Sequence, residues 1–418
     1  MILEPGDSYE TPWVYYSYSP AGLDAASARI HGWLRSLPRH PRGPRPVLVN
    51  TWEAAYFDHD HAALYALADA AAEVGAERFV LDDGWFRHRR SDNAGLGDWY
   101  VDQEIYPQGL EPLAEYVRGK GLEFGLWFEP EMINPDSDIA RAHPEWIAQP
   151  HALEAAARGG GRLPLEARSQ QVLDLTHPEA FAYIEERLHS LVAALRPASL
   201  KWDHNRDLHE AGNSASGRPI GHSQTLAFYR LLDGLQEAFP GLEIESCSGG
   251  GARVDLGVLE RAQRVWTSDC NDPLERQRMQ LHTSLLVPPG MMGAHIGPPR
   301  AHTTHRTSSL DFRAGTALWG HLGIEWNVAG EEASDPRTRA EIAAWVALYK
   351  QHRALLHSGT VVRSDLPVPG RVLHGVVAAD RSEALYGFAA VDSVVEQPTG
   401  LLRLEGLDPD RSYRIAPL

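Results

Sequence analysis

Two aspartates in this 418-residue chain stand where a short apolar segment gives way to a polar loop. Asp203 follows the strand-like segment 198–202, and Asp269 follows the segment 264–268. Two carboxylates that face one pocket can share the work of cleaving a glycosidic bond. The ionised one attacks the anomeric carbon, and the protonated one gives its proton to the leaving oxygen. The pair therefore indicates the chemistry of a retaining glycosidase.

A third segment of the same kind lies between the two aspartates. Residues 242–247 run into the glycines at 249–251, where the missing Cβ atoms let backbone amides approach a ligand closely. A single aspartate at a strand end is usually a turn former or a helix N-cap. Several polar strand ends in succession favour a shared site instead, because the catalytic groups of parallel α/β barrels come from the carboxyl ends of the strands.

The spacing of apolar segments predicts an α/β fold, specifically a (β/α)8 TIM barrel. From about residue 45, short strands alternate with polar loops and with helices rich in alanine and leucine, such as the helix expected over 61–74. A doubly wound open sheet would carry a glycine fingerprint after its first strand, and this chain has none there. The strands are expected at 46–50, 78–81, 122–127, 291–295 and 323–326, and in the segments that lead to Asp203, Cys247 and Asp269.

The pattern changes after about residue 345. The later segments alternate like half-buried strands separated by turns, at 360–363, 371–377, 384–388 and 401–404. We therefore expect the catalytic barrel over 45–345 and a small C-terminal antiparallel β domain over 346–418, which lacks an edge. The proline-rich stretch 39–46 is typical of an extended linker.

Composition narrows the class of partner. A net charge of −17 argues against nucleic acid or an anionic membrane surface, so a neutral small molecule is expected. Cys247 and Cys270 are the two cysteines of the sequence, so a reducing compartment is expected. Residues 1–7 show no basic, apolar signal pattern, and no apolar run has the length of a membrane span. The sequence therefore predicts a cytoplasmic protein.

Seven short motifs, taken in order, resemble the α-galactosidases of glycoside hydrolase family 36. They are NTWEAAYF at 50–57, LDDGWF at 81–86, GLGDW at 95–99, GLWFEPEM at 125–132, KWD at 201–203, CSGGG at 247–251 and WTSD at 266–269. The resemblance implies a retaining exo-α-galactosidase that hydrolyses terminal α-galactosides of the melibiose and raffinose type without a cofactor or metal. It also implies that Asp203 is the nucleophile and Asp269 the general acid/base.

The same resemblance implies a set of substrate-binding residues. In it, Asp82 and Asp83 accept hydrogen bonds from the galactose 4- and 6-hydroxyls, Trp127 lies against the sugar, and Arg168 reaches the sugar ring. Cys247 and Gly250 contact the 2-hydroxyl, and Trp52 closes the aglycone side. Lys201 is two residues before Asp203 on the same strand and so shares its side, where its cation helps to keep that carboxylate ionised. Glu129 and Glu131 are expected to have supporting roles.

The chain also departs from the family pattern. His204 replaces an expected methionine, the loop Cys270-Asn271-Asp272-Pro273 is altered, and residues 150–167 are expected to form a flexible insertion. Family members carry a large N-terminal β-sandwich, of which residues 1–44 would keep a remnant and a linker. In tetrameric relatives that domain helps to complete a neighbour's pocket, so a homo-oligomer is one expectation and its form stays open.

Three other functions remain open from the sequence. A galactosyltransferase of the raffinose-synthase type would share the chemistry up to the glycosyl-enzyme, but no acceptor site is evident. A metal-dependent barrel hydrolase would need ligands at strand ends, and His295, His302 and His305 have no carboxylate at ligand spacing. A catalytically silent galactoside-binding protein is the third.

Overall fold

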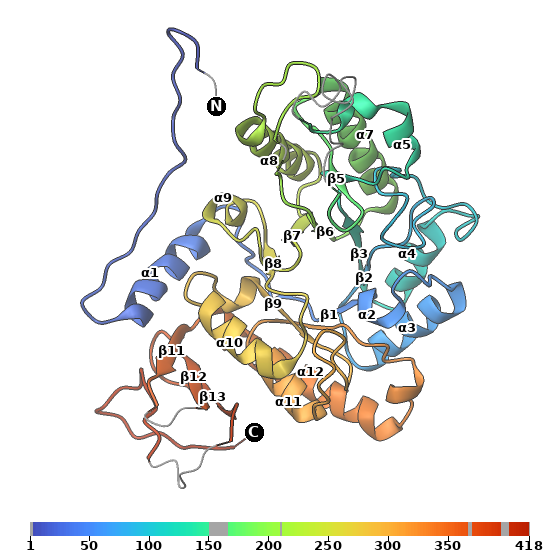
Figure 1. The fold of residues 1–418 in the computed structure, drawn as a ribbon. Coiled ribbons are helices and arrows are strands. Elements are labelled where there is room, and N and C mark those ends of the chain that lie inside the picture. The colour runs from blue at the N-terminus through green and yellow to red at the C-terminus, as the bar shows by residue number, and fades with distance from the viewer. Residues whose placement is uncertain (1–2, 150–165, 210, 367–369, 394–400, 418) are drawn as a thin grey trace.

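Eight parallel strands close into a barrel in the computed structural model, which describes residues 3–149, 166–209, 211–366, 370–393 and 401–417. Around the barrel the strands follow the order β1-β2-β3-β6-β7-β8-β9-β10, and β10 pairs again with β1 (Figure 1). The predicted (β/α)8 barrel is confirmed. The strands are β1 (Leu48–Asn50), β2 (Arg78–Leu81), β3 (Glu123–Phe128), β6 (Ser199–Trp202), β7 (Glu243–Ser246), β8 (Arg264–Trp266), β9 (Met292–Ile296) and β10 (His321–Ile324).

Helices cover the outside of the barrel, and most of them bury an apolar stripe, whereas α10 buries mainly polar side chains. In α3 that stripe contains Leu64, Leu67, Ala68 and Ala71, as the sequence predicts. The long helices are α3 (His61–Glu73), α4 (Glu111–Gly119), α7 (Pro178–Leu195), α8 (Gly221–Ala238), α10 (Pro273–Thr283), α11 (Leu310–Ala317) and α12 (Pro336–Ser358). Shorter ones are α2 (Trp52–Ala55), α5 (Asp138–Ala142) and α9 (Leu256–Leu259), with 3-10 turns η1 (Pro144–Trp146), η2 (Pro289–Met291) and η3 (Glu331–Ala333).

A small second sheet, absent from the sequence prediction, extends the loop between β3 and β6. Its strands β4 (Met132–Ile133) and β5 (Gln171–Val172) pair antiparallel, with Met132 opposite Val172. This sheet brings the segment before β5, which contains Arg168, back over the end of the barrel. Most of the predicted insertion, residues 150–165, lies outside the described residues.

The C-terminal sheet has three antiparallel strands in the order β11-β12-β13. They are β11 (Thr360–Ser364), β12 (Arg371–Val377) and β13 (Ala384–Ala390). The predicted strand at 401–404 is wrong: these residues form no strand and lie largely exposed, so their apolar side chains have no core to cover. The predicted boundary near residue 345 falls inside α12, which contacts α11 of the barrel and also β12 and β13.

The N-terminal region contains a helix that the sequence analysis did not predict. Residues 3–20 run as an extended segment without helix or strand, and α1 (Leu23–Ser36) follows (Figure 1). Asp24 in α1 accepts a hydrogen bond of 2.7 Å from the backbone N–H of Arg363 in β11. Assignment of residues 1–44 to a β domain stays a prediction. Among the described residues, no helix combines the length and hydropathy needed to cross a bilayer.

Candidate active site

One pocket at the carboxyl ends of the barrel strands collects eight of the ten predicted site residues. Because parallel strands all end at the same edge of the barrel, residues far apart in the chain meet there. The eight that line it are Trp52, Asp82, Asp83, Trp127, Arg168, Lys201, Asp203 and Asp269. Seven further residues line it that the sequence analysis did not assign to the site or to binding: Glu53, Arg89, Asp92, Gln170, Asn205, Trp266 and Glu325.

Asp203 follows β6 directly and is held as a carboxylate by several donors. Trp127 Nε1 donates to Oδ2 at 3.2 Å, Asn205 Nδ2 donates to the same oxygen at 2.7 Å, and the His204 backbone N–H donates to Oδ1 at 2.9 Å. Burial by itself would raise the pKa of Asp203. The Lys201 cation and hydrogen bonds from Asn205 and Cys247 outweigh it, so the pKa of this carboxyl lies below its ordinary value.

Asp269 has the opposite electrostatic environment. Burial raises its pKa, and the negative charge of Asp203 raises that pKa further. Trp266 Nε1 donates a hydrogen bond of 3.0 Å to Asp269 Oδ1, which fixes the orientation of the carboxyl group. One pocket therefore contains an acid that favours the ionised form and an acid that favours the protonated form, the division that two carboxyl groups with separate roles require.

Lys201 is buried in the middle of the barrel and bridges two sides of the pocket. Its Nζ lies 2.7 Å from Asp82 Oδ2, an oxygen that also accepts a hydrogen bond of 2.6 Å from Asn50 Nδ2. Its direct ion pair is thus with Asp82, which follows β2, two strands away from β6 around the barrel. The cation also lowers the pKa of Asp203, in the direction expected from the sequence.

Asp83 is paired with an arginine that the sequence analysis did not select. Arg89 Nη2 lies 2.8 Å from Asp83 Oδ2, and Arg89 Nε lies 3.0 Å from Oδ1. Burial raises the pKa of Asp83, and the adjacent guanidinium opposes that effect. Arg89 is 1% exposed, so this pair forms a rigid wall of the pocket. The spacing Asp-x5-Arg does not predict an ion pair by itself, because the contact depends on the path of the loop between the two residues.

Asn205 links the Asp203 carboxylate to the loop that contains Arg168. While its Nδ2 donates to Asp203, its Oδ1 accepts a hydrogen bond of 2.8 Å from Arg168 Nη1. The Asn205 backbone N–H donates to Glu129 Oε1 at 2.5 Å. Burial, together with the charge of Asp203, raises the pKa of Glu129 to about 8. Glu129 thus lies behind the nucleophile candidate, and its supporting role stays a prediction.

A pair of buried glutamates lies just beyond β1 and β10, with Glu53 in α2 and Glu325 directly after β10. Asn271 Nδ2 donates to Glu53 Oε1 at 2.8 Å and to Glu325 Oε2 at 2.9 Å, so one amide fixes both carboxylates. Both glutamates line the pocket, and Glu53 is adjacent in sequence to the predicted Trp52. Each stands just beyond a strand end, which is the signal that could have selected them.

Cys247 and Gly250 lie beside the pocket and are not among the residues that line it. Burial raises the pKa of the Cys247 thiol, with a further contribution from Asp203, so the thiol stays protonated and donates to Asp203. Gly250 has a φ of +86°, and a Cβ there would come within 2.6 Å of Ser268 Cα. Their predicted contact with a sugar hydroxyl stays a prediction.

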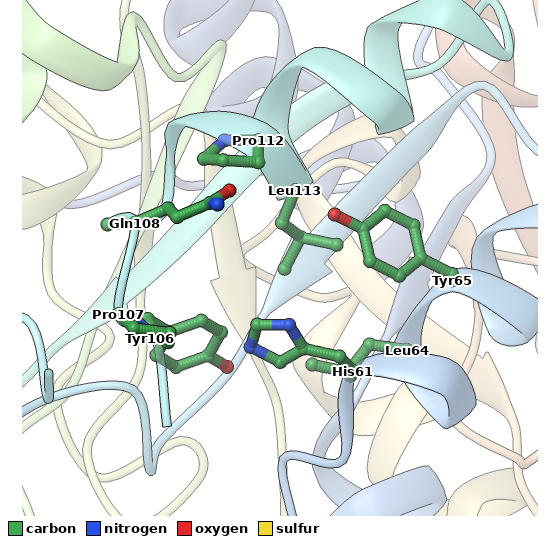
Figure 2. A pocket seen from close by; sticks show the side chains of 9 residues that line it. His61, Leu64, Tyr65, Tyr106, Pro107, Gln108, Pro112 and Leu113 are labelled. Atoms are coloured by element: carbon green, nitrogen blue, oxygen red, sulfur yellow. The ribbon is translucent and has the colours of Figure 1, made fainter. Parts of the chain in front are cut away.

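Another cavity lies on the outer side of the barrel, between α3 and α4. Figure 2 shows its lining, in which the rings of His61 and Tyr106 stack at 5.1 Å. Its volume is about 240 Å³, compared with about 40 Å³ for the candidate site, but no carboxylate lines it. Size therefore does not identify the reactive site. Within the described ranges, no group of three histidine, cysteine, aspartate or glutamate side chains is placed to bind a metal ion.

Comparison with known proteins agrees with this geometry. The family model for melibiase matches residues 8–359. The chain is 43% identical to an α-galactosidase of Escherichia coli over 415 residues, which cover 99% of this chain and 57% of the relative. The crystal structure of the GH36 α-galactosidase AgaA from Geobacillus stearothermophilus matches with a TM-score of 0.85 at 37% identity, over 93% of this chain and 53% of that one.

Two further crystal structures of AgaA variants contain raffinose in one case and stachyose in the other. The present chain spans little more than half the length of these relatives. The match confirms the resemblance found in the sequence, and the chain belongs to the melibiase family, with solved relatives among the α-galactosidases of glycoside hydrolase family 36.

Proposed function

We propose that this protein is a retaining exo-α-galactosidase, with Asp203 as nucleophile and Asp269 as general acid/base. The observation that carries the proposal is the opposite pKa shift of these two carboxyl groups within one pocket. A nucleophile must be ionised before it attacks, and a general acid must keep its proton until the leaving group departs. Lys201 favours the first condition, and burial favours the second.

The chemistry follows from these two states. Asp203 forms a covalent bond to the anomeric carbon while the glycosidic bond breaks, and Asp269 transfers its proton to the departing oxygen. Asp269, now ionised, then takes a proton from a water molecule, which attacks the anomeric carbon and releases Asp203. Two inversions give net retention. Trp127 and Asn205 donate hydrogen bonds to Asp203 Oδ2 and so hold the carboxylate in one orientation.

The substrate class is inferred from the relatives. Crystal structures of AgaA variants contain raffinose in one case and stachyose in the other. We infer that the present chain accepts terminal α-galactosyl residues of the melibiose and raffinose type. Asp82 and Asp83 are proposed to accept hydrogen bonds from the 4- and 6-hydroxyls, with Trp127 against the sugar face.

The remaining predicted residues complete the pocket in this proposal. Arg168 is positioned by Asn205 to reach the ring hydroxyls, and Trp52 closes the side on which the leaving group departs. Cys247 and Gly250 are proposed to contact the 2-hydroxyl, where hydrogen bonds gain strength in the transition state.

The direct test is hydrolysis of 4-nitrophenyl α-galactoside by the purified chain in the presence of EDTA. We expect release of 4-nitrophenol from this substrate and none from the α-glucoside or the β-galactoside. EDTA should have no effect, because both proposed catalytic groups are carboxyl side chains. Absence of hydrolysis with all three substrates, from folded protein, would contradict the proposed activity and make galactose binding the next measurement.

A second prediction concerns the pH dependence of kcat/KM for melibiose. Activity should fall as pH decreases through the lowered pKa of Asp203, because the nucleophile becomes protonated. It should also fall as pH rises through the raised pKa of Asp269, because the acid loses its proton. The dependence of kcat/KM on pH is therefore expected to be bell-shaped.

Glu129 provides the control for this profile, because its pKa of about 8 could produce the same alkaline limb. We expect Glu129→Gln to keep an alkaline limb, since that limb belongs to Asp269. If the alkaline limb disappeared in Glu129→Gln, the group that sets this limb would be Glu129 and not Asp269.

A further inference from the structure

Arg276 is a buried arginine in α10 that forms no ion pair within the described part of the chain. Its guanidinium instead donates to five uncharged oxygens. Nε donates to the Cys270 carbonyl at 2.6 Å, and Nη2 donates to the Ser268 carbonyl at 2.5 Å and to Asn271 Oδ1 at 3.3 Å. Nη1 donates to Thr267 Oγ1 and, at 3.2 Å, to the Gly293 carbonyl.

Four of these five acceptors belong to one loop, and Asp269 lies at its centre. The carbonyls of Ser268 and Cys270 flank Asp269 on either side in sequence. Because the five N–H groups of an arginine lie in one rigid plane, they fix the path of the backbone on both sides of the proposed acid/base. A lysine has three donors on a flexible stem and cannot reproduce this pattern.

Arg276 also supports the side chain that orients the Asp269 carboxyl. Its guanidinium carbon lies 4.4 Å from the centre of the Trp266 ring. Trp266 Nε1 in turn donates to Asp269 Oδ1 at 3.0 Å. One cation therefore acts on Asp269 by two routes, through the backbone and through the indole. The two routes rest on independent contacts.

The loop is packed on its other side by the glycine run. A Cβ on Gly250 would approach Ser268 Cα within 2.6 Å, and one on Gly251 would approach the Thr267 carbonyl oxygen within 2.5 Å. The 267–269 backbone is thus held between Arg276 and two glycines. Burying an arginine without a carboxylate is costly, and burial lowers the pKa of Arg276 to about 10. The five hydrogen bonds offset that cost, and four of them go to this one loop.

We propose that Arg276 is a positioning residue that places the Asp269 carboxyl for proton transfer to the leaving group. The proposal rests on the proposed glycosidase function and names a residue that acts on the reaction through Asp269 without touching the substrate. A shift of about 1 Å in a reacting group can cost on the order of 100-fold in rate. Loss of Arg276 should therefore reduce proton transfer far more than it reduces attack by Asp203.

The test compares kcat/KM for two substrates in Arg276→Lys and Arg276→Met. Melibiose needs a proton on its leaving oxygen, whereas 4-nitrophenyl α-galactoside does not. We expect the loss with melibiose to exceed the loss with the aryl galactoside by roughly 10- to 100-fold. Azide should accelerate turnover of the aryl substrate and give α-galactosyl azide, because azide needs no general base. Guanidinium chloride, but not sodium chloride, should partly restore melibiose hydrolysis by Arg276→Met.

Arg313 offers a matched control. It is a buried arginine in α11 that stacks over Trp326 at 4.8 Å, donates to the Gly297 carbonyl, and forms no ion pair among the described residues. Burial lowers its pKa to about 10 as well. None of its hydrogen bonds reaches the 267–271 loop. Arg313→Lys should reduce the unfolding temperature and change the two substrates by equal factors.

The outcomes separate the two proposals. An inactive wild-type chain would overturn the glycosidase function and the role of Arg276 with it. An active wild type with equal losses for both substrates in the Arg276 variants would overturn only the positioning role. Failure of both variants to fold, judged by circular dichroism and unfolding temperature, would also overturn it, because the arginine would then serve fold stability.

Discussion

Replacing Asp203 with alanine is expected to abolish turnover of both melibiose and 4-nitrophenyl α-galactoside. The variant has no group that can form the covalent intermediate, and loss of a nucleophile costs on the order of 10⁶-fold in kcat. The activated leaving group cannot compensate, because bond formation at the anomeric carbon is the missing step. The measurement is the initial rate with each substrate at matched enzyme concentration.

Rescue of Asp203→Ala by azide would show that the lost group is the nucleophile. A small anion can enter the space vacated by the Asp203 side chain and attack from the same face, which yields β-galactosyl azide. Recovery of the α-azide, or unchanged activity, would remove Asp203 from this role. Asp203→Asn is the matched variant: it keeps the volume and the acceptor for Trp127 and Asn205, so it should be equally inactive while the fold is preserved.

Replacing Asp269 with alanine should separate the two substrates. Proton transfer contributes typically 10²- to 10⁴-fold to a rate, so kcat/KM for melibiose should fall by about that factor. For 4-nitrophenyl α-galactoside, whose leaving group departs without a proton, the fall in kcat/KM should be less than about 10-fold. Added azide should raise kcat with the aryl substrate and give the α-azide, since Asp203 still forms the intermediate.

Glu325 is the control for this experiment, because its carboxyl lines the same pocket. Glu325→Gln should reduce kcat/KM for both substrates by similar factors. If Asp269→Ala also gave equal losses, Asp269 would not be the acid/base. If Glu325→Gln gave the selective loss instead, the role would pass to Glu325.

The barrel could be predicted from the sequence because its strands are short apolar runs that end in polar loops. In β2 and β6 every residue is buried, as expected for parallel strands covered on both faces. Since all such strands end at one edge, Asp82, Asp203 and Asp269 had to lie near one another once the fold was known. The shared pocket therefore follows from the barrel fold and from the place of each aspartate shortly after a strand.

The pairings inside the pocket could not be predicted in the same way. Period-two alternation places Lys201 on the same side as Asp203, but it does not predict the ion pair of Lys201 with Asp82, two strands away. The contact between Arg89 and Asp83 depends on the path of a loop without regular structure. The contacts of Arg276 could not be predicted either, because an arginine in an amphipathic helix is usually solvent-exposed.

One local prediction failed and one helix was not predicted, both for reasons of burial. Residues 401–404 alternate like a strand, yet they form no strand and stay largely exposed, with a side-chain hydrogen bond of 3.2 Å from Ser364 of β11 to the Arg403 carbonyl. The helix α1 was missed because its buried face includes Ser27 and His31 beside Leu34. Polar residues on the packed face erase the apolar periodicity on which the prediction depends.

The helix α12 has a consequence for how the molecule unfolds. Its 23 residues contact α11 of the barrel and also β12 and β13 of the C-terminal sheet, and its buried Ile342, Val346, Tyr349, Leu355 and Leu356 lie on both sides of residue 345. A chain cut at that point would expose Tyr349, Leu355 and Leu356 to water. Barrel and sheet therefore share one cooperative unit, and heating should melt them in a single transition.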